Sequence, residues 1–373
     1  MSSSTIRKIA SHYLLTPQGF YKYPLITVDA ESGEILHTEC YGGNLDSIPQ
    51  VEFYSGIICP GFVNAHCHSE LSVMKGAISE QIGYAGFAAA MAQIRGTFSN
   101  EERKEAIATA DHQMWAEGIN FVADIVNDDT SFDIKLNSPI KYTSFAEVFG
   151  LKQSNLERCK SLINNPNTDL TPHSIYSIQD CDFAEVCNAN SAPISIHFKE
   201  SEAEQLLFEG KGSLAEWYSA VGFECDFLHH GSPAKRIVDI VPADKRVIFV
   251  HNCFVTQEDI DLIMNHFTVP VYWVLCPRSN KYISGAVPNV SELLMKNNLN
   301  ICIGTDSLAS NHSLSILEEL KCFDSVPLEQ LLRWATYNGA AALGVKPRGI
   351  INICGADLER MKLTEKSAVR RVL

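Results

Sequence analysis

The residues of this chain that could do chemistry are histidines and acids that follow short apolar runs. His66 and His68 end one run, His197 and His251 end two others, and Asp306 ends a fourth. Alternate residues of a strand point to the same side, so both histidines of the first pair can face one site. Imidazole nitrogens together with one carboxylate are ligands that zinc-like ions prefer. The pattern therefore predicts a metal centre built at several strand ends.

Each of these residues also has a structural interpretation when it is taken alone. A single histidine at a strand end is commonly a hydrogen-bonded structural residue. Asp306 precedes a segment that looks helical and could be its N-cap. Glu200, three residues after His197, could be a first-turn glutamate that favours the helix dipole. The coincidence of these residues at four separate strand ends favours the metal centre.

The alternation of short apolar runs with longer helical patterns, from Gly56 to about Gly344, predicts the framework that positions these residues. Continuous apolar runs are typical of parallel strands that are covered on both faces. Eight such runs with helices between them predict an α/β fold, a (β/α)8 TIM-like barrel, whose reactive residues gather at the carboxyl ends of the strands. The predicted strands are residues 56–65, 119–124, 141–147, 169–173, 193–197, 246–251, 269–275 and 300–306.

Both ends of the chain carry short β-type segments instead of this alternation. Residues 8–16, 25–29 and 34–41 are separated by turn residues, and the chain after residue 346 returns to short β-like pieces. We expect a small β domain formed by both termini, residues 1–55 and 347–373. The metal-dependent barrel would then occupy residues 56–346.

Composition limits the kinds of partner. The chain has 373 residues with 46% hydrophobic and 20% charged residues, enough for a barrel core. Its net charge of −14 repels polyanions on average, so we expect no nucleic-acid and no membrane partner. No apolar run approaches the roughly 18 residues of a membrane span. The N-terminus lacks a signal-peptide core, and the twelve cysteines show no CxxC pair. These features predict a cytoplasmic protein with reduced thiols.

Taken together, these segments resemble the amidohydrolase superfamily, and within it the metal-dependent deaminases of aminated heterocycles. The pattern is most similar to methylthioadenosine, S-adenosylhomocysteine and aminodeoxyfutalosine deaminases, and the runs after His68 and Cys276 favour the aminodeoxyfutalosine side. The resemblance spans about residues 55 to 345. It rests on the runs Pro60 to His68, Thr171 to His173, Ile196 to Ser201, Phe249 to Asn252, Cys276 to Asn280 and Gly304 to Asn311.

The resemblance implies one divalent metal ion, which His66, His68, His197 and Asp306 would hold. Zinc is the preferred ion, and ferrous iron fits the same ligands. Two-metal relatives usually bridge their ions with a lysine on the fourth strand, and residues 169–174 contain none. The resemblance therefore favours a single-metal site, which would make hydroxide available at neutral pH.

The resemblance also implies a hydrolytic deamination that releases ammonia from a purine nucleoside-like ring. Glu200 would move a proton from the water to a ring nitrogen. His251 would hydrogen-bond the attacking oxygen, and Asp306 would deliver a proton to the leaving amine.

Four further residues are candidates for binding the substrate. His173 is expected at the heterocycle or at a sugar hydroxyl. Glu70 either contacts the substrate or accepts an imidazole N–H of a ligand. Arg278 either pairs with a substrate carboxylate or forms a structural salt bridge. Glu147 could bridge metals, contact the substrate or be a buried carboxylate with a structural partner. The segment of residues 83–87 could be a mobile substrate wall or an ordinary loop.

Two other functions stay open at this level. A cyclic amide hydrolase uses the same kind of site, although Glu200 favours deamination because ring-nitrogen protonation needs such an acid. A metal-binding but catalytically silent interaction protein is disfavoured, because all the motif positions are present. The expected partner is a small-molecule substrate. A homodimer is only the general expectation for barrels of this type.

Overall fold

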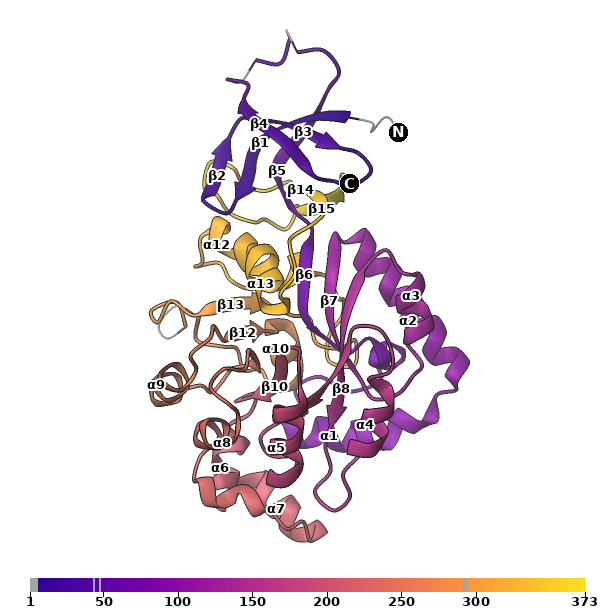
Figure 1. Cartoon of the computed structure of the whole chain (residues 1–373), viewed down its shortest axis with the longest axis vertical. Helices are drawn as coiled ribbons and strands as arrows, with labels where there is room; N and C mark the ends of the chain where they lie inside the picture. Colours follow the sequence, from indigo (N-terminus) through magenta and orange to yellow (C-terminus); the bar gives the residue numbers. More distant parts are fainter. Residues whose placement is uncertain (1–5, 43, 47, 291–293) are drawn as a thin grey trace.

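The computed structural model describes residues 6–42, 44–46, 48–290 and 294–373. Figure 1 shows strands and helices that alternate through most of the molecule, with a separate group of strands at one end. The alternating part carries the residues that the sequence analysis singled out, so its strand ends decide where they lie.

Eight strands form two four-stranded sheets in which all neighbours are parallel. Their side chains are almost all buried, which explains why the sequence shows continuous apolar runs here. One sheet has the order β6 (Phe62–Cys67), β7 (Ile119–Val126), β8 (Lys141–Val148) and β9 (Thr168–Pro172). The other has the order β10 (Ile194–Phe198), β11 (Val247–His251), β12 (Tyr272–Leu275) and β13 (Asn300–Ile303).

The two sheets approach each other at both edges. A parallel bridge joins Ser174, just after β9, to His197 in β10. Another parallel bridge joins Cys67 of β6 to Asp306, just after β13. The strands therefore have the TIM-like α/β arrangement, present as two hydrogen-bonded half-sheets with short bridges between them.

Helices follow the strands and cover the outer faces of the sheets (Figure 1). Among the described residues, none of the helices combines the length and apolar character needed to cross a bilayer. Capping boxes of a side chain and an acid three residues later start α2, α6 and α9. The helices are α2 (Asn100–Ala116), α3 (Phe132–Asn137), α4 (Leu156–Leu162), α5 (Asp180–Ala189), α6 (Glu202–Phe208), α7 (Gly212–Val221), α8 (Pro233–Ile240), α9 (Gln257–His266), α10 (Pro277–Ile283), α11 (Ile316–Leu320), α12 (Leu328–Arg333) and α13 (Gly339–Leu343), besides α1 described below.

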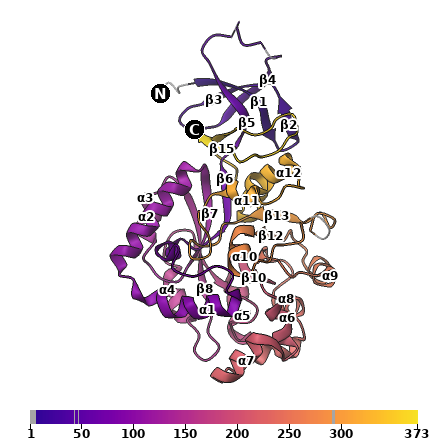
Figure 2. The ribbon, with the colours of Figure 1, turned by 180° about the vertical axis from the view of Figure 1, so that it is seen from behind.

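One seven-stranded sheet joins segments from both ends of the chain. Figures 1 and 2 show it from opposite sides at one end of the molecule, next to β6 and α12. Its path is β15-β14-β5-β1-β3-β4, with β2 paired to β1. The strands are β1 (Ile6–Thr16), β2 (Gly19–Lys22), β3 (Pro24–Asp29), β4 (Ile35–Cys40), β5 (Val51–Pro60), β14 (Ile350–Cys354) and β15 (Ala368–Arg371).

The structure differs from the sequence analysis where one strand was expected over residues 56–65. Here β5 ends in the terminal sheet and β6 starts the parallel sheet, with Gly61 between them. A Cβ at Gly61 would lie 1.9 Å from Oδ1 of Asn120, so only glycine fits this passage. An apolar run that crosses from one sheet to the next cannot be told from a single strand by its composition.

Arg371 in β15 fastens the terminal sheet to the parallel part. Its guanidinium lies 3.4 Å from the ring centroid of Trp115 and donates hydrogen bonds to the carbonyl oxygens of Trp115 and Ile119. A further N–H donates to Oδ1 of Asn120 at 2.9 Å. These acceptors lie at the end of α2 and the start of β7, so one side chain connects three segments.

We expect Arg371→Met to lower the free energy of unfolding by about 2–4 kcal/mol, because half-buried carbonyl groups lose their donors. Urea unfolding followed by circular dichroism measures this change. The matched control is Arg370→Met, since Arg370 is exposed and stacks only on Tyr54, at 5.1 Å. Equal destabilisation by both variants would contradict the fastening role of Arg371.

Candidate active site

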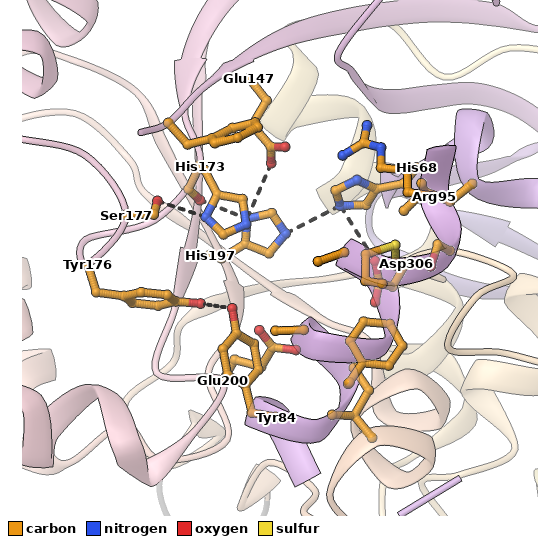
Figure 3. A pocket seen from close by; sticks show the side chains of 18 of the residues that line it. His68, Tyr84, Arg95, Glu147, His173, Tyr176, Ser177, His197, Glu200 and Asp306 are labelled. Atoms are coloured by element: carbon orange, nitrogen blue, oxygen red, sulfur yellow. Dashed lines mark hydrogen bonds and ion pairs between the residues drawn. The ribbon is translucent and has the colours of Figure 1, made fainter. Parts of the chain in front are cut away.

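A cavity of about 350 Å³ opens at the carboxyl ends of the parallel strands. Figure 3 shows labelled side chains from both half-sheets pointing toward one another in it. Among the described residues, three predicted site residues do not line it: His66, Glu70 and Arg278. The predicted residues that line it are His68, Glu147, His173, His197, Glu200, His251 and Asp306.

The four predicted metal ligands converge on one point at the cavity floor. The Nε2 atom of His68 lies 3.1 Å from Nε2 of His66 and 3.3 Å from Nε2 of His197. Oδ1 of Asp306 lies 3.7 Å from Nε2 of His66 and 3.6 Å from Nε2 of His68. Ligands about 2.0–2.2 Å from a single ion stand roughly 3.3 Å apart at the corners of a tetrahedron. The separations of these four atoms therefore fit one divalent ion.

The protonation of the imidazoles suits this role. Burial lowers the pKa of His66 and of His197 well below the usual range, and the neighbouring imidazoles lower both further. Nδ1 of His197 donates to the carbonyl oxygen of His173 at 2.7 Å, which leaves the lone pair of Nε2 directed at the cluster. The three imidazole Nε2 atoms stand too close together for shared protons to satisfy them all, and a cation satisfies them together.

Asp306 is held as a carboxylate. Burial by itself would raise the pKa of Asp306, but the facing His68 and His251 and a hydrogen bond from Ser279 lower it below its ordinary value. Oδ2 accepts hydrogen bonds from the hydroxyls of Ser279 at 2.5 Å and Ser310 at 2.8 Å. Oδ1 is thereby left to face the histidines.

The backbone is strained where these side chains leave their strands. His251 has a φ of 78°, Asp306 a φ of 56° and Lys199, next to Glu200, a φ of 52°. Such left-handed conformations cost of order 1 kcal/mol or more for residues with a side chain. The surrounding hydrogen bonds must hold them, and strain of this kind is typical of functional sites.

Glu200 is held by a second acid. Glu204, at the third position of α6, accepts hydrogen bonds from the backbone N–H groups of Lys199, Glu200 and Ser201. These bonds fix the turn after β10 and direct Glu200 into the cavity. Burial raises the pKa of Glu200 well above its ordinary value, and Asp306 and Glu204 raise it further. A raised pKa makes a carboxyl group a better proton acceptor than an ordinary glutamate, which suits a residue that takes up a proton and returns it.

His251 is held in a defined tautomer. The amide Nδ2 of Asn280 donates to Nδ1 of His251 at 3.0 Å, so the ring proton is on Nε2. Burial lowers the pKa of His251 to about 4, which keeps the ring neutral. Nε2 lies 3.7 Å from Oε1 of Glu200, so this N–H points at the space that the two residues share.

Two of the predicted substrate contacts lie beside this centre. His173 stacks on His197 with ring centroids 4.7 Å apart, and its Nδ1 is paired with the hydroxyl of Ser177 at 2.9 Å. Oε2 of Glu147 accepts from Nδ2 of Asn127, while Oε1 has no hydrogen-bond partner and lies 3.8 Å from Nδ1 of His197.

The other two predicted contacts lie behind the cavity wall. The backbone N–H of Arg278 donates to Glu319 and its Nε donates to Asn311, while its Nη1 lies 3.4 Å from Glu318. This geometry fits the structural salt bridge rather than an anion reader. Glu70 is buried and pairs with Arg95.

Most of the cavity wall consists of residues that were not predicted from the sequence. Residues 83–87, left open there as a wall or a loop, begin helix α1 (Gly83–Ile94), which has no fully buried residue. Tyr84, Phe87, Met91 and Arg95 face the cavity from one side of this segment. Their spacing of three and four residues is the signal that could have found them. Other elements add Phe149, Tyr176, Trp217 and Tyr218, and the ring of Tyr176 lies against that of Tyr84.

Comparison with known families agrees with this geometry. The model of the amidohydrolase family matches residues 57–353, which is well over half of the chain. The protein therefore belongs to the amidohydrolase family. Members of this superfamily bind a metal ion, and the converging histidines and aspartate are the corresponding candidate here.

The chain is similar in sequence to several curated deaminases. It is 28% identical over 339 residues to a protein of Helicobacter pylori named adenosine deaminase, covering 84% of this chain and 81% of that protein. It is 23% identical to an aminodeoxyfutalosine deaminase of Nitratiruptor, with 96% and 92% covered. It is 25% identical to a 5-methylthioadenosine/S-adenosylhomocysteine deaminase of Halobacterium salinarum, with 95% and 84% covered.

Solved structures share the fold. The aminofutalosine deaminase of Helicobacter pylori, solved in complex with methylthio-coformycin, superposes with a TM-score of 0.80 at 23% identity, covering 96% of this chain and 93% of that one. An adenosine deaminase from Xanthomonas campestris with bound zinc gives a TM-score of 0.73 at 18% identity, covering 97% and 89%. At these identities the likeness establishes the fold.

The hydrogen bond from Ser279 to Asp306 predicts that removing the Ser279 hydroxyl weakens metal binding. In Ser279→Ala the carboxylate loses a hydrogen bond that orients it, so we expect zinc affinity to fall roughly 10–100-fold. Competition with a chromophoric chelator measures the affinity without any substrate. Ser313→Ala is the control, because the hydroxyl of Ser313 has no partner and is buried. Unchanged affinity in Ser279→Ala would contradict Asp306 as a ligand held by Ser279.

The raised pKa of the buried Glu319 predicts how the free energy of unfolding depends on pH. Burial raises the pKa of Glu319 to about 8. In the unfolded chain a glutamate has its ordinary pKa of roughly 4.3. Between these values the folded protein holds a proton that the unfolded chain has lost. Stability therefore falls as the pH rises through this window.

In Glu319→Gln this contribution disappears. We expect its free energy of unfolding to decline less steeply than that of the wild type, by as much as about 1 kcal/mol per pH unit between about pH 5 and pH 8. Urea unfolding across this range measures the slopes. Glu318→Gln, at a half-exposed neighbour, should follow the wild type. Parallel slopes for wild type and Glu319→Gln would refute the buried-acid explanation.

Proposed function

We propose that this protein is a metal-dependent deaminase of a purine nucleoside-like substrate. The reaction replaces an amino group on the ring by a carbonyl oxygen and releases ammonia. The observation that carries the proposal is the convergence of a four-ligand cluster with a high-pKa acid and a neutral histidine donor in one cavity. The deaminase names of its relatives support it.

His66, His68, His197 and Asp306 would hold the divalent ion. Zinc is the proposed ion, since one imidazole-rich site with a carboxylate suits it and a structural neighbour carries zinc. When bound, the ion supplies a water molecule of lowered pKa. The chain offers no lysine at the end of β9, so we propose a single ion.

Glu200 is the proposed proton carrier. Its raised pKa suits removal of a proton from the water and delivery of that proton to the ring nitrogen next to the amine-bearing carbon. Protonation of the nitrogen makes the adjacent carbon electrophilic. The new C–O bond forms at that carbon while the ring electrons move toward the protonated nitrogen.

His251 and Asp306 complete the reaction. The Nε2–H of His251 hydrogen-bonds the attacking oxygen and orients it. Asp306 takes the remaining proton of that oxygen and passes it to the departing amine. The C–N bond then breaks, ammonia leaves, and a carbonyl group remains on the ring, so that water and the aminated ring balance the two products.

His173 and Glu147 are the proposed contacts to the heterocycle, because both line the cavity beside His197. His173 is stacked parallel to His197, so its free ring edge is available to a ring nitrogen or a hydroxyl. Glu147 has an unpaired oxygen at this place. A small-molecule ligand is consistent with the inhibitor complex of a structural neighbour.

Ammonia release by zinc-loaded protein tests the proposal. The panel holds adenosine, methylthioadenosine, S-adenosylhomocysteine, aminodeoxyfutalosine, guanine and cytosine. We expect ammonia from a purine nucleoside, and a loss of kcat of roughly 10²–10⁴ in Glu200→Gln, which removes the proton carrier. Glu202→Gln, at an exposed position of the same turn, is the matched control and should stay active.

Removal of the ion separates the remaining outcomes. A chelator should abolish turnover and added zinc should restore it, whereas His68→Ala should stay inactive with zinc. Ring opening without ammonia would refute deamination and indicate a cyclic amide hydrolase. Zinc binding without turnover of amines or cyclic amides would refute an enzymatic role.

A further inference from the structure

The cavity has two chemically different sides. Figure 3 shows Glu147, His68 and Arg95 on one side of the view and Tyr176 and Tyr84 on the other. Phe87, Trp217 and Tyr218 add further aromatic surface to the cavity lining. A ligand that fills this space must present one polar edge and one apolar face.

The polar side is a connected strip. Arg95 donates to Oε1 of Glu70, and the backbone N–H of Asn127 donates to Oε2 of Glu70 at 2.9 Å. Nδ2 of Asn127 then donates to Oε2 of Glu147 at 3.2 Å. The strip therefore runs from the end of α1, through the loops after β6 and β7, to the end of β8. The strip ends at Glu147, beside the predicted metal ligands.

Arg95 is the member of this strip that is placed to meet a ligand. Its side chain is 36% exposed and lines the cavity, whereas the side chain of Glu70 is only 1% exposed. A guanidinium carries five N–H donors. Within the described part of the chain, only its contact with Glu70 engages them. Its remaining donors have no hydrogen-bond partner among the described residues, so they are available to a ligand in the cavity that Arg95 lines.

The charge around Arg95 decides what kind of group it can bind. Its positive charge is already paired with the carboxyl group of Glu70, and the next member of the strip brings the carboxyl group of Glu147. Among the described lining residues Arg95 is the only arginine or lysine, while Glu147, Glu200 and Asp306 are acids. An anionic group would be desolvated here without a free counter-charge. An uncharged oxygen would accept the free N–H donors without this cost.

We propose that Arg95, held in place by Glu70, is a specificity-determining residue that hydrogen-bonds uncharged hydroxyl oxygens of the substrate. In a nucleoside these are the sugar hydroxyls. The site thereby selects neutral nucleosides over those that carry a carboxylate or a phosphate. This inference rests on the proposed function and names the substrate class of the same site.

The first experiment pairs a change in the protein with a change in the substrate. The zinc-loaded wild type should prefer adenosine over 2′,3′-dideoxyadenosine by roughly 10–100-fold in kcat/KM, the effect of a hydrogen bond to a charged group. Arg95→Met should lose this preference because the hydroxyls then have no donor. A preference that persists in Arg95→Met would overturn the assignment.

A binding measurement keeps this test independent of turnover. Calorimetry with inosine and 2′,3′-dideoxyinosine, which are already deaminated, should show the same preference and the same loss. Inosine binding to a protein that releases no ammonia would refute the proposed function alone. Ammonia release with an unchanged hydroxyl preference would refute the role of Arg95 alone. Binding of neither nucleoside would refute both.

Charge selection is tested with adenosine 5′-monophosphate and aminodeoxyfutalosine. Both should be turned over less efficiently than adenosine by the wild type. Arg95→Met should lower their turnover by no more than it lowers that of adenosine, because all three lose only the contact to the sugar hydroxyls. If either is the better substrate and Arg95→Met removes that advantage, Arg95 reads an anion and the proposed neutral class is wrong.

Two control variants exclude a purely structural effect. Arg95→Met leaves the carboxyl group of Glu70 unpaired, so the double variant Arg95→Met/Glu70→Gln provides a protein without that buried charge. It should show the same lost preference and a thermal stability near that of the wild type. Arg103→Met breaks a comparable pair with Asp128 outside the cavity and should keep the preference. Loss of the hydroxyl preference in Arg103→Met would show that any general disturbance of the structure removes this preference, which would overturn the proposal.

Discussion

Four candidate ligand atoms from three strand ends must be held within a few ångströms of one another in a buried place. The imidazoles of His66, His68 and His197 can share this space only when they are neutral, and burial lowers the pKa of His66 and His197 in this direction. Two half-sheets supply these side chains, and short parallel bridges beside His197 and Asp306 bring the sheet edges together. The rest of the molecule can be understood as the framework that keeps this group from separating.

That framework acts through atoms that never reach the cavity floor. Ser279 and Ser310 donate hydrogen bonds to one oxygen of Asp306. Asn280 fixes the tautomer of His251. Glu204 accepts a hydrogen bond from the backbone N–H of Glu200. The strand ends carry unfavourable positive φ angles at His251 and Asp306, which such bonds must offset. These hydrogen bonds position the side chains without a ligand, and donors positioned in advance are the larger part of electrostatic catalysis.

The groups proposed to react and the wall around them lie on different elements. The former lie at or just after the ends of the parallel strands, whereas much of the wall comes from α1, α7 and the segments that follow β8 and β9. Loops and half-buried helices tolerate replacement better than barrel strands do, which is why one framework serves related reactions. In this chain the pairing of Arg95 with Glu70 converts a cationic side chain into a donor suited to neutral oxygens.

The sequence by itself was enough to predict the approximate places of the parallel strands, the candidate ligands and Glu200, because strand alternation and strand ends are local properties that leave a pattern in residue spacing. His66 and His68 face one site for that reason alone. Only the tertiary structure decided that the predicted strand is divided at Gly61, that Arg278 lies behind the cavity wall, and that Arg95 lines the cavity. None of these follows from spacing, since each depends on which element packs against which. Residues 27 positions apart, such as His68 and Arg95, line one cavity only because α1 folds back over the strand ends, and long-range packing cannot be inferred from a local pattern.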